Sequence, residues 1–194
     1  MRNKVLLVAL LMLFACGSAF AMAPDRTGRL DIGVSGGGAF NDGGMEDAGY
    51  VQGNASVGVI NQYWAVGIES GYQEADAAAD ETVGKVSILG DIIFRVPPPH
   101  WLDENLVPYA LLGLGVVGTY VEDEDGVAPT NNGDDVDDTD FAVKIAGGFD
   151  WFFHPNWAVV FELGYIFNDP SLPGSSVDGD GDYLTVTGGI KYLF

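Results

Sequence analysis

The sequence is short of two residue classes, cysteine and the basic residues. Its single cysteine, Cys16, lies within the first 21 residues. The rest of the chain therefore forms no internal disulfide bond, and its stability must come from other interactions. Lysine and arginine together number 8, against 28 aspartate and glutamate residues, and the net charge is −20. A chain this acidic repels phosphate groups, which argues against direct binding of nucleic acid.

Histidine is also scarce, with only His100 and His154 in the whole chain. Both fall in predicted turns, and neither is matched with a serine and an acid in the way that nucleophilic catalysis requires. Metal sites built on histidine or cysteine have no support either. Gly113, Gly115 and Gly118 match a dinucleotide-binding fingerprint, but an acidic stretch follows them where a helix is needed. We expect no enzyme activity and no tightly bound cofactor.

Long apolar runs are missing after the first residues. The nearest, Leu106 to Val121, is interrupted by proline, glycine and threonine and does not suit a membrane-spanning helix. The first residues, MRNKVLLVALLMLFACGSAFA, combine a basic start, an apolar segment and a small-x-small end. This pattern predicts a cleaved signal peptide over residues 1–21 and export of residues 22–194. Lipoprotein processing at Cys16 is the alternative.

The chain is rich in segments where every second residue is apolar, the period of a β-strand. The segments are residues 28–40, 51–59, 64–73, 85–95, 109–120, 141–153, 159–167 and 183–194. Each is near the roughly ten residues that a tilted strand needs to cross a bilayer. The pattern predicts an all-β fold, an eight-stranded antiparallel up-and-down transmembrane β-barrel. A soluble exported β-barrel is the alternative.

The connections and the aromatic residues also favour a membrane barrel. Long polar loops at 41–48, 74–82, 121–140 and 168–181 alternate with shorter turns, although the proline-rich turn 96–106 is long. Aromatic residues gather near strand ends and predict two girdles at headgroup level. The predicted turn-side girdle is Tyr63, Trp64, Trp101, Tyr109, Trp151, Phe153, Trp157, Tyr192 and Phe194. The predicted loop-side girdle is Phe40, Tyr50, Tyr72, Tyr120, Phe141, Phe167 and Tyr183.

The charged residues divide into two groups. Most acids lie in the long loops, which contain no lysine or arginine. There Asp178, Asp180 and Asp182 form a weak candidate metal site, because the terminal acid of a calcium loop is missing. We expect loosely bound Ca²⁺ or Mg²⁺ at these loops, bridging to anionic headgroups. The second group faces the interior, where we expect ion pairs that fill the lumen, with a narrow polar conduit as the alternative. These residues are Asp31, Glu69, Lys85, Asp91, Arg95, Lys144, Asp150, Glu162 and Lys191.

Three stretches carry a family resemblance: PYALLGLGVVG (108–118), AGGFDWFFHPNWAVVFELGY (146–165) and TGGIKYLF (187–194). They resemble the small eight-stranded outer-membrane β-barrel family, the OmpA/OmpX/OmpW-like group. The resemblance implies a place in the outer membrane of a Gram-negative bacterium, among its lipid and lipopolysaccharide. The last stretch resembles the signal read by the outer-membrane assembly machinery. We expect a monomer with a non-enzymatic structural or surface-interaction role; the alternative is a narrow channel for small or hydrophobic solutes.

Overall fold

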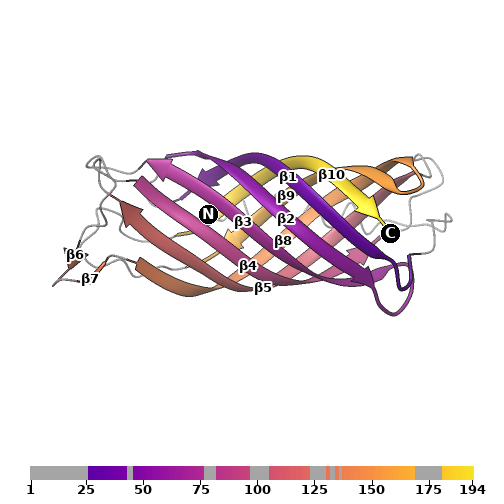
Figure 1. Cartoon of the computed structure of the whole chain (residues 1–194), viewed down its shortest axis with the longest axis horizontal. Helices are drawn as coiled ribbons and strands as arrows, with labels where there is room; N and C mark the ends of the chain where they lie inside the picture. The colour runs from indigo at the N-terminus through magenta and orange to yellow at the C-terminus, as the bar shows by residue number, and fades with distance from the viewer. Residues whose placement is uncertain are drawn as a thin grey trace.

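The computed structural model describes residues 26–42, 46–76, 82–96, 105–122, 130–131, 134–135, 137–168 and 181–194. Within them a closed antiparallel barrel is formed by β1 (Leu30–Asn41), β2 (Ala48–Gly58), β3 (Trp64–Asp76), β4 (Thr82–Arg95), β5 (Leu106–Glu122), β8 (Asp137–His154), β9 (Trp157–Phe167) and β10 (Tyr183–Leu193). The last strand, β10, closes the barrel against β1 (Figure 1). The predicted fold class is confirmed. The described residues include no helix that is long and apolar enough to cross a membrane.

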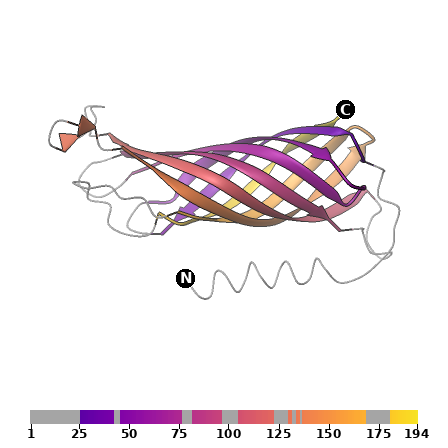
Figure 2. The same ribbon diagram turned by 90° about the horizontal axis from the view of Figure 1, so that it is seen from below.

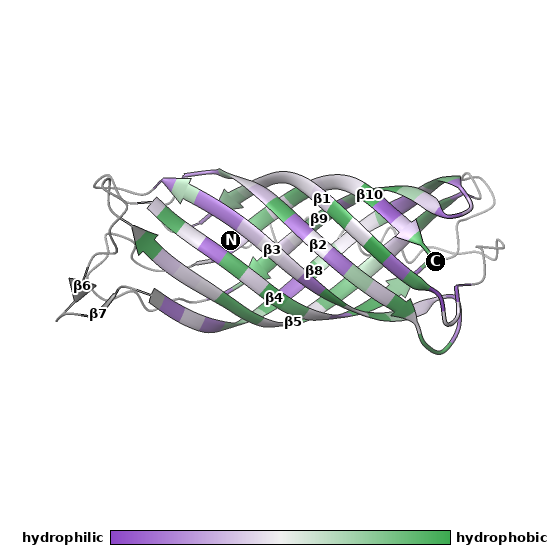
Figure 3. Cartoon of the chain, viewed as in Figure 1, coloured by the Kyte–Doolittle hydropathy of each residue, from purple (hydrophilic) through white to green (hydrophobic). Residues whose placement is uncertain are grey.

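The outside of the barrel is apolar because the strand period places alternate residues on opposite faces. Large side chains such as Val34, Ile68 and Phe141 are 65%, 56% and 67% exposed. Figure 3 shows hydrophobic and hydrophilic residues alternating along the strands. An apolar surface this extensive is stable in hydrocarbon rather than in water, and closure leaves no unpaired strand edge to desolvate. These features exclude the soluble alternative.

The strands extend further toward the long loops than the sequence pattern predicted. β5 has 17 residues and β8 has 18, and the two continue to pair through Tyr120 and Asp137. The prediction of a loop over residues 121–140 was therefore too long, because β5 ends at Glu122 and β8 begins at Asp137. A small separate hairpin, β6 (Thr130–Asn131) with β7 (Asp134–Asp135), lies beyond this end of the barrel (Figures 1 and 2). Strand pairing depends on backbone hydrogen bonds and not on the alternation of apolar side chains, so it can continue beyond the alternating segment.

Three tyrosines assigned to the girdles point into the barrel instead. Tyr50, Tyr109 and Tyr183 are 1%, 4% and 1% exposed. Glycine makes room for such rings: a Cβ atom at Gly71 would overlap the Tyr50 hydroxyl group, and one at Gly148 would lie 2.8 Å from the Tyr109 hydroxyl oxygen. An aromatic residue near a strand end therefore does not identify a girdle position unless its face is also considered.

The turn-side girdle itself is present on the outer face. Trp157 packs edge-on against Tyr192 at a centroid distance of 4.8 Å, and Tyr192 packs against Phe194 at 4.7 Å. Trp64 packs on Phe94, also at 4.8 Å. Trp101 lies outside the described residues. The contacts of Trp157 with Tyr192 and of Trp64 with Phe94 join neighbouring strands at the end of the barrel where the chain finishes.

Candidate functional site: the charged lumen

The structure places all nine of the predicted lumen residues in the interior of the barrel. Each is 7% exposed or less, and they come from six of the barrel strands. They face inward because each occupies the parity opposite to the apolar, lipid-facing positions of its strand. Buried charges of this kind are stable only when they are paired or hydrogen-bonded. The pairing is therefore the property that decides what the lumen can do.

Lys144 on β8 is the centre of the middle cluster. Its Nζ atom donates to Glu69 Oε1 and Oε2 at 2.6 and 2.7 Å, and to Glu162 Oε1 at 2.7 Å. Glu162 also accepts from the Tyr109 hydroxyl group at 2.9 Å and from Gln52 Nε2 at 3.3 Å. These contacts join strands β2, β3, β5, β8 and β9 across the interior, which ties together strands that are not neighbours in the sheet.

A second cluster closes the lumen at the turn end. The guanidinium group of Arg95 pairs with Asp31 Oδ2, which also accepts from Ser56 Oγ at 3.3 Å. Beside it, Asp150 accepts from Lys191 Nζ at 2.9 Å and from an arginine outside the strands, Arg26, at 3.2 Å. The cations outnumber the acids in this layer, the reverse of the middle cluster.

Arg26 is a buried lumen residue that the alternating pattern did not predict. It precedes β1 but is only 1% exposed, and its Cζ atom lies 4.1 Å from the centroid of the Phe152 ring. A tight turn puts it there: the Arg29 backbone N–H donates to the Arg26 carbonyl at 3.0 Å, and Gly28 has a φ of 75°. Glycine adopts that conformation without strain. The only sequence signal was Gly28, two residues after an arginine.

At the loop end the lumen contains Lys85 and the inward-facing tyrosines Tyr50 and Tyr183. Lys85 Nζ donates to the Gly181 carbonyl at 2.6 Å and lies 4.9 Å from the Tyr183 ring centroid. Its partner is thus a backbone group and an aromatic face, so it anchors the chain that enters β10 to β4. This contact was not predictable from the strand pattern, because Gly181 is in a loop.

Of the three predicted metal ligands, only Asp182 is among the described residues. Its Oδ1 accepts from the Asn168 backbone N–H at 2.9 Å, and its Oδ2 accepts from the Tyr165 hydroxyl group at 3.2 Å. Tyr165 also reaches Asp42 Oδ2 at 3.0 Å. Asp178 and Asp180 lie outside the described residues. The described part of the chain brings together no group of three or more candidate metal ligands.

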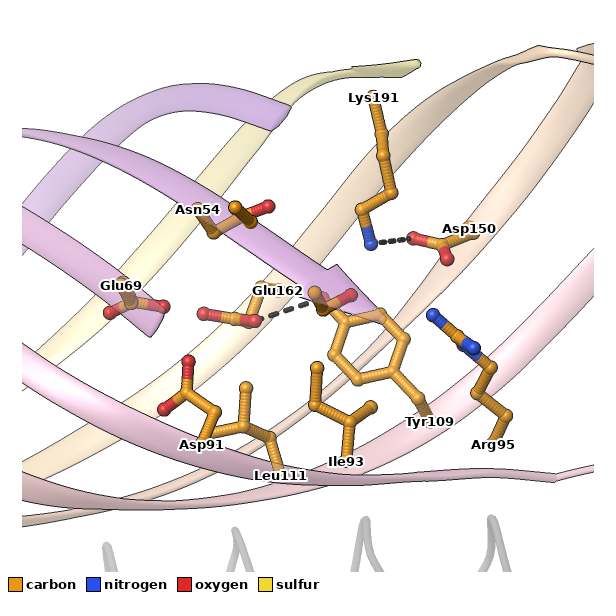
Figure 4. Close-up of a pocket in the computed structure, with 12 residues that line it drawn as sticks. Asn54, Glu69, Asp91, Ile93, Arg95, Tyr109, Leu111, Asp150, Glu162 and Lys191 are labelled. Atoms are coloured by element: carbon orange, nitrogen blue, oxygen red, sulfur yellow. Dashed lines mark hydrogen bonds and ion pairs between the residues drawn. The ribbon is translucent and has the colours of Figure 1, made fainter. Parts of the chain in front are cut away.

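A small cavity separates the two clusters. It is lined by residues of both, including Glu69, Asp91 and Glu162 on one side and Arg95 and Lys191 on the other (Figure 4). The volume open to the centre of a water molecule is about 20 Å³. That is room for about one water molecule, and no more. Its lining combines carboxylates, cations and the Tyr109 hydroxyl group, so it is suited to a small polar species and too small for an organic solute.

Among the described residues, those that the sequence offered for catalysis or dinucleotide binding do not line this cavity. His154 ends β8 at the turn, is exposed, and its Nδ1 atom accepts the Asn156 backbone N–H at 3.3 Å. His100 lies outside the described residues. Gly113, Gly115 and Gly118 lie within β5, so the strand context contradicts a dinucleotide-binding turn.

Comparisons with known proteins agree with this architecture. A family model described as outer membrane protein beta-barrel domain matches residues 7–194. Among solved structures, the chain is similar to Neisserial surface protein A, with a TM-score of 0.61, 11% identity and 88% of this chain and 99% of that chain covered. It is also similar to the attachment invasion locus protein Ail of Yersinia pestis, with a TM-score of 0.54, 16% identity and coverages of 87% and 99%.

A third similar structure is the outer membrane protein OprG of Pseudomonas aeruginosa, with a TM-score of 0.52, 13% identity and coverages of 90% and 99%. No curated protein matches the chain significantly. At these identities the structures show a shared barrel fold and leave the roles of individual residues to be argued from this chain.

Proposed function

The chain belongs to the outer membrane protein beta-barrel domain family and lies in the bacterial outer membrane, and from that premise we propose that it is a non-enzymatic barrel with a structural and surface-interaction role. The observation that supports this proposal most is the filled lumen. Ion-paired side chains occupy its middle and its turn end. The barrel is built to be rigid and closed rather than to conduct.

The channel alternative requires a continuous passage, and ion-paired side chains occupy the middle and the turn end of the lumen. Arg26 is buried at the turn end and pairs with Asp150, and the cavity between the two charged clusters has room for about one water molecule. Opening the lumen for a solute would break buried ion pairs. Separating the two charges of such a pair inside the barrel costs several kcal/mol, because each charge is left buried without compensation. A narrow channel for small or hydrophobic solutes is therefore the weaker of the two proposals.

Conductance in planar bilayers separates the two functions. We expect the purified barrel to give no regular current steps above the leak of the bilayer. Arg26→Ala removes the buried side chain at the turn end, so it is the variant in which a current is easiest to detect. Arg29→Ala is its control, because Arg29 lies at the rim and donates to the Phe194 carbonyl. Regular current steps from the unmodified barrel would refute the closed-barrel proposal in favour of a channel.

The surface role rests on the charge of the loop end. Described residues at this rim include the acids Asp42, Glu46, Glu74, Asp76 and Asp182. Ail of Yersinia pestis has been crystallised with the heparin analogue sucrose octasulfate, a polyanion. An acidic rim repels polyanions, so we propose that this barrel instead engages cations, including Mg²⁺ or Ca²⁺ that bridge to the phosphates of lipid and lipopolysaccharide headgroups.

Unfolding in bilayers of different charge tests the bridging. We expect Mg²⁺ to raise the thermal midpoint of the barrel in anionic lipid and EDTA to lower it, with little effect in zwitterionic lipid. Glu74→Gln with Asp76→Asn should weaken the response, and Asp150→Asn, inside the barrel, should leave it in place. A response of equal size in both lipids would count against headgroup bridging.

A further inference from the structure

Asp91 on β4 is a buried acid without a partner. It is 4% exposed, and its Oδ1 atom is enclosed without any hydrogen-bond acceptor or donor against it. Among the described residues it makes no hydrogen bond and no ion pair, in contrast to Asp31, Glu69, Asp150 and Glu162. Oδ1 lies over Gly113 of β5, where an added Cβ atom would be 2.8 Å from it. An ionised carboxylate in such a place costs several kcal/mol.

The nearest cation has no capacity left for Asp91. Lys144 offers three hydrogens, and its short contacts to Glu69 and Glu162 use them. Arg95 and Lys191, on the other side of the cavity, pair with Asp31 and Asp150. Ionised, the middle cluster would therefore hold three carboxylates against a single ammonium group.

The cavity beside Asp91 does not solve this by taking up a metal ion. Its space suits about one water molecule, and the described residues form no group of three or more candidate metal ligands. A water molecule can donate one hydrogen bond to Asp91, but it brings no charge to offset the carboxylate. The smallest species that neutralises the Asp91 carboxylate is a proton, which lowers the excess negative charge of the middle cluster by one.

We propose that Asp91 carries a proton in the folded barrel, so that the centre of the lumen is a proton-binding site. The carboxyl group of Glu69 is a competitor for that proton, but both of its oxygens accept hydrogen bonds from Lys144. Figure 4 shows the Asp91 carboxyl group at the cavity with no interaction marked to the other residues drawn. The charged and titratable groups that face Asp91 or its cavity are Glu69 of β3, Arg95 of β4, Tyr109 of β5, Lys144 and Asp150 of β8, Glu162 of β9 and Lys191 of β10.

The proposal predicts a measurable dependence of folding stability on pH. In the unfolded chain an aspartate is ionised at neutral pH, so unfolding releases the proton held by Asp91. Stability must therefore fall as pH rises, with the folding equilibrium constant decreasing about tenfold per pH unit for one proton. Asp91→Asn removes this contribution while preserving the shape of the side chain. We expect urea unfolding in lipid vesicles to show a pH slope smaller by about one proton in the variant.

Infrared spectroscopy of the folded, full-length barrel tests the protonation directly. We expect a carboxylic acid C=O band at neutral pH that shifts in D₂O and is absent from Asp91→Asn. Asp31→Asn is the matched control: it changes a lumen aspartate that is paired with Arg95, so the band should remain. If Asp91→Asn does not fold, the number of protons released on unfolding can be measured with the unmodified protein in weak buffer.

Three outcomes would overturn the proposal. One is the absence of the acid band from the unmodified barrel. Another is a band that persists in Asp91→Asn and disappears in Glu69→Gln, which would assign the proton to Glu69. The third is a band that is lost on adding Na⁺ or Ca²⁺ at constant pH, which would show that the cavity takes a metal ion instead.

Discussion

Replacing Lys144 with methionine tests whether the lumen's ion pairs hold the barrel together. Methionine keeps an unbranched apolar stem and removes the ammonium group. Three hydrogen bonds, of 2.6, 2.7 and 2.7 Å, are lost from Glu69 and Glu162 at once. Removing one partner of a buried ion pair costs about 3–5 kcal/mol, because the other charge is left buried without compensation. We expect Lys144→Met to lose at least about 3 kcal/mol of unfolding free energy.

The assay is equilibrium urea unfolding in lipid vesicles, followed by tryptophan fluorescence and by the gel shift of the folded barrel. Lys85→Met is the matched control, because Lys85 donates its hydrogen bond to a neutral group, the Gly181 carbonyl, and is not held between two carboxylates as Lys144 is. Its loss should be smaller, about 1–3 kcal/mol. Glu69→Gln and Glu162→Gln, added to Lys144→Met, should restore most of the stability, since the uncompensated charges are then gone.

Equal losses for Lys144→Met and Lys85→Met would contradict the reasoning, since they would show that the lumen is hydrated well enough to tolerate unpaired carboxylates. Failure of the triple variant to recover would point the same way, toward packing rather than charge as the source of the effect. Either result would remove the main support for a rigid, closed lumen.

Three other changes test separate parts of the structure by the same unfolding assay. Gly28→Ala should cost about 1–2 kcal/mol, since Gly28 has a φ of 75°, and it should raise the bilayer conductance if the turn that positions Arg26 loosens. Tyr109→Phe should cost about 1.5–3 kcal/mol, because Glu162 loses a donor at 2.9 Å. Val34→Arg, on the lipid face near the middle of β1, should cost about 2–4 kcal/mol, whereas Val34→Leu should be nearly neutral; an equal cost for both would argue against lipid contact there.

The pairing of the charges could not be predicted from the strand pattern. A period of two determines which face a residue occupies, but not its height in the barrel or the reach of its side chain. Lys144 and Glu69 are 75 residues apart and meet across the lumen, although β5 and β4 lie between their strands in the sheet. Tyr50 and Tyr183 were misplaced for a related reason: their nearness to strand ends was weighed more than their inward parity. Arg26 was missed because it lies outside every alternating segment.

The sequence by itself determined the architecture, because alternation, polar connections and the acidic loops are local properties that survive in any arrangement of the strands. Its eight segments close only if β1 meets β10, since an open edge in hydrocarbon leaves unpaired backbone groups. Tertiary structure alone decided that Arg26 turns back into the lumen, that Lys144 satisfies two carboxylates, and that Asp91 is left without a partner. Those outcomes depend on distances of a few ångströms across a closed barrel, and charge pairing is sensitive to distance on that scale.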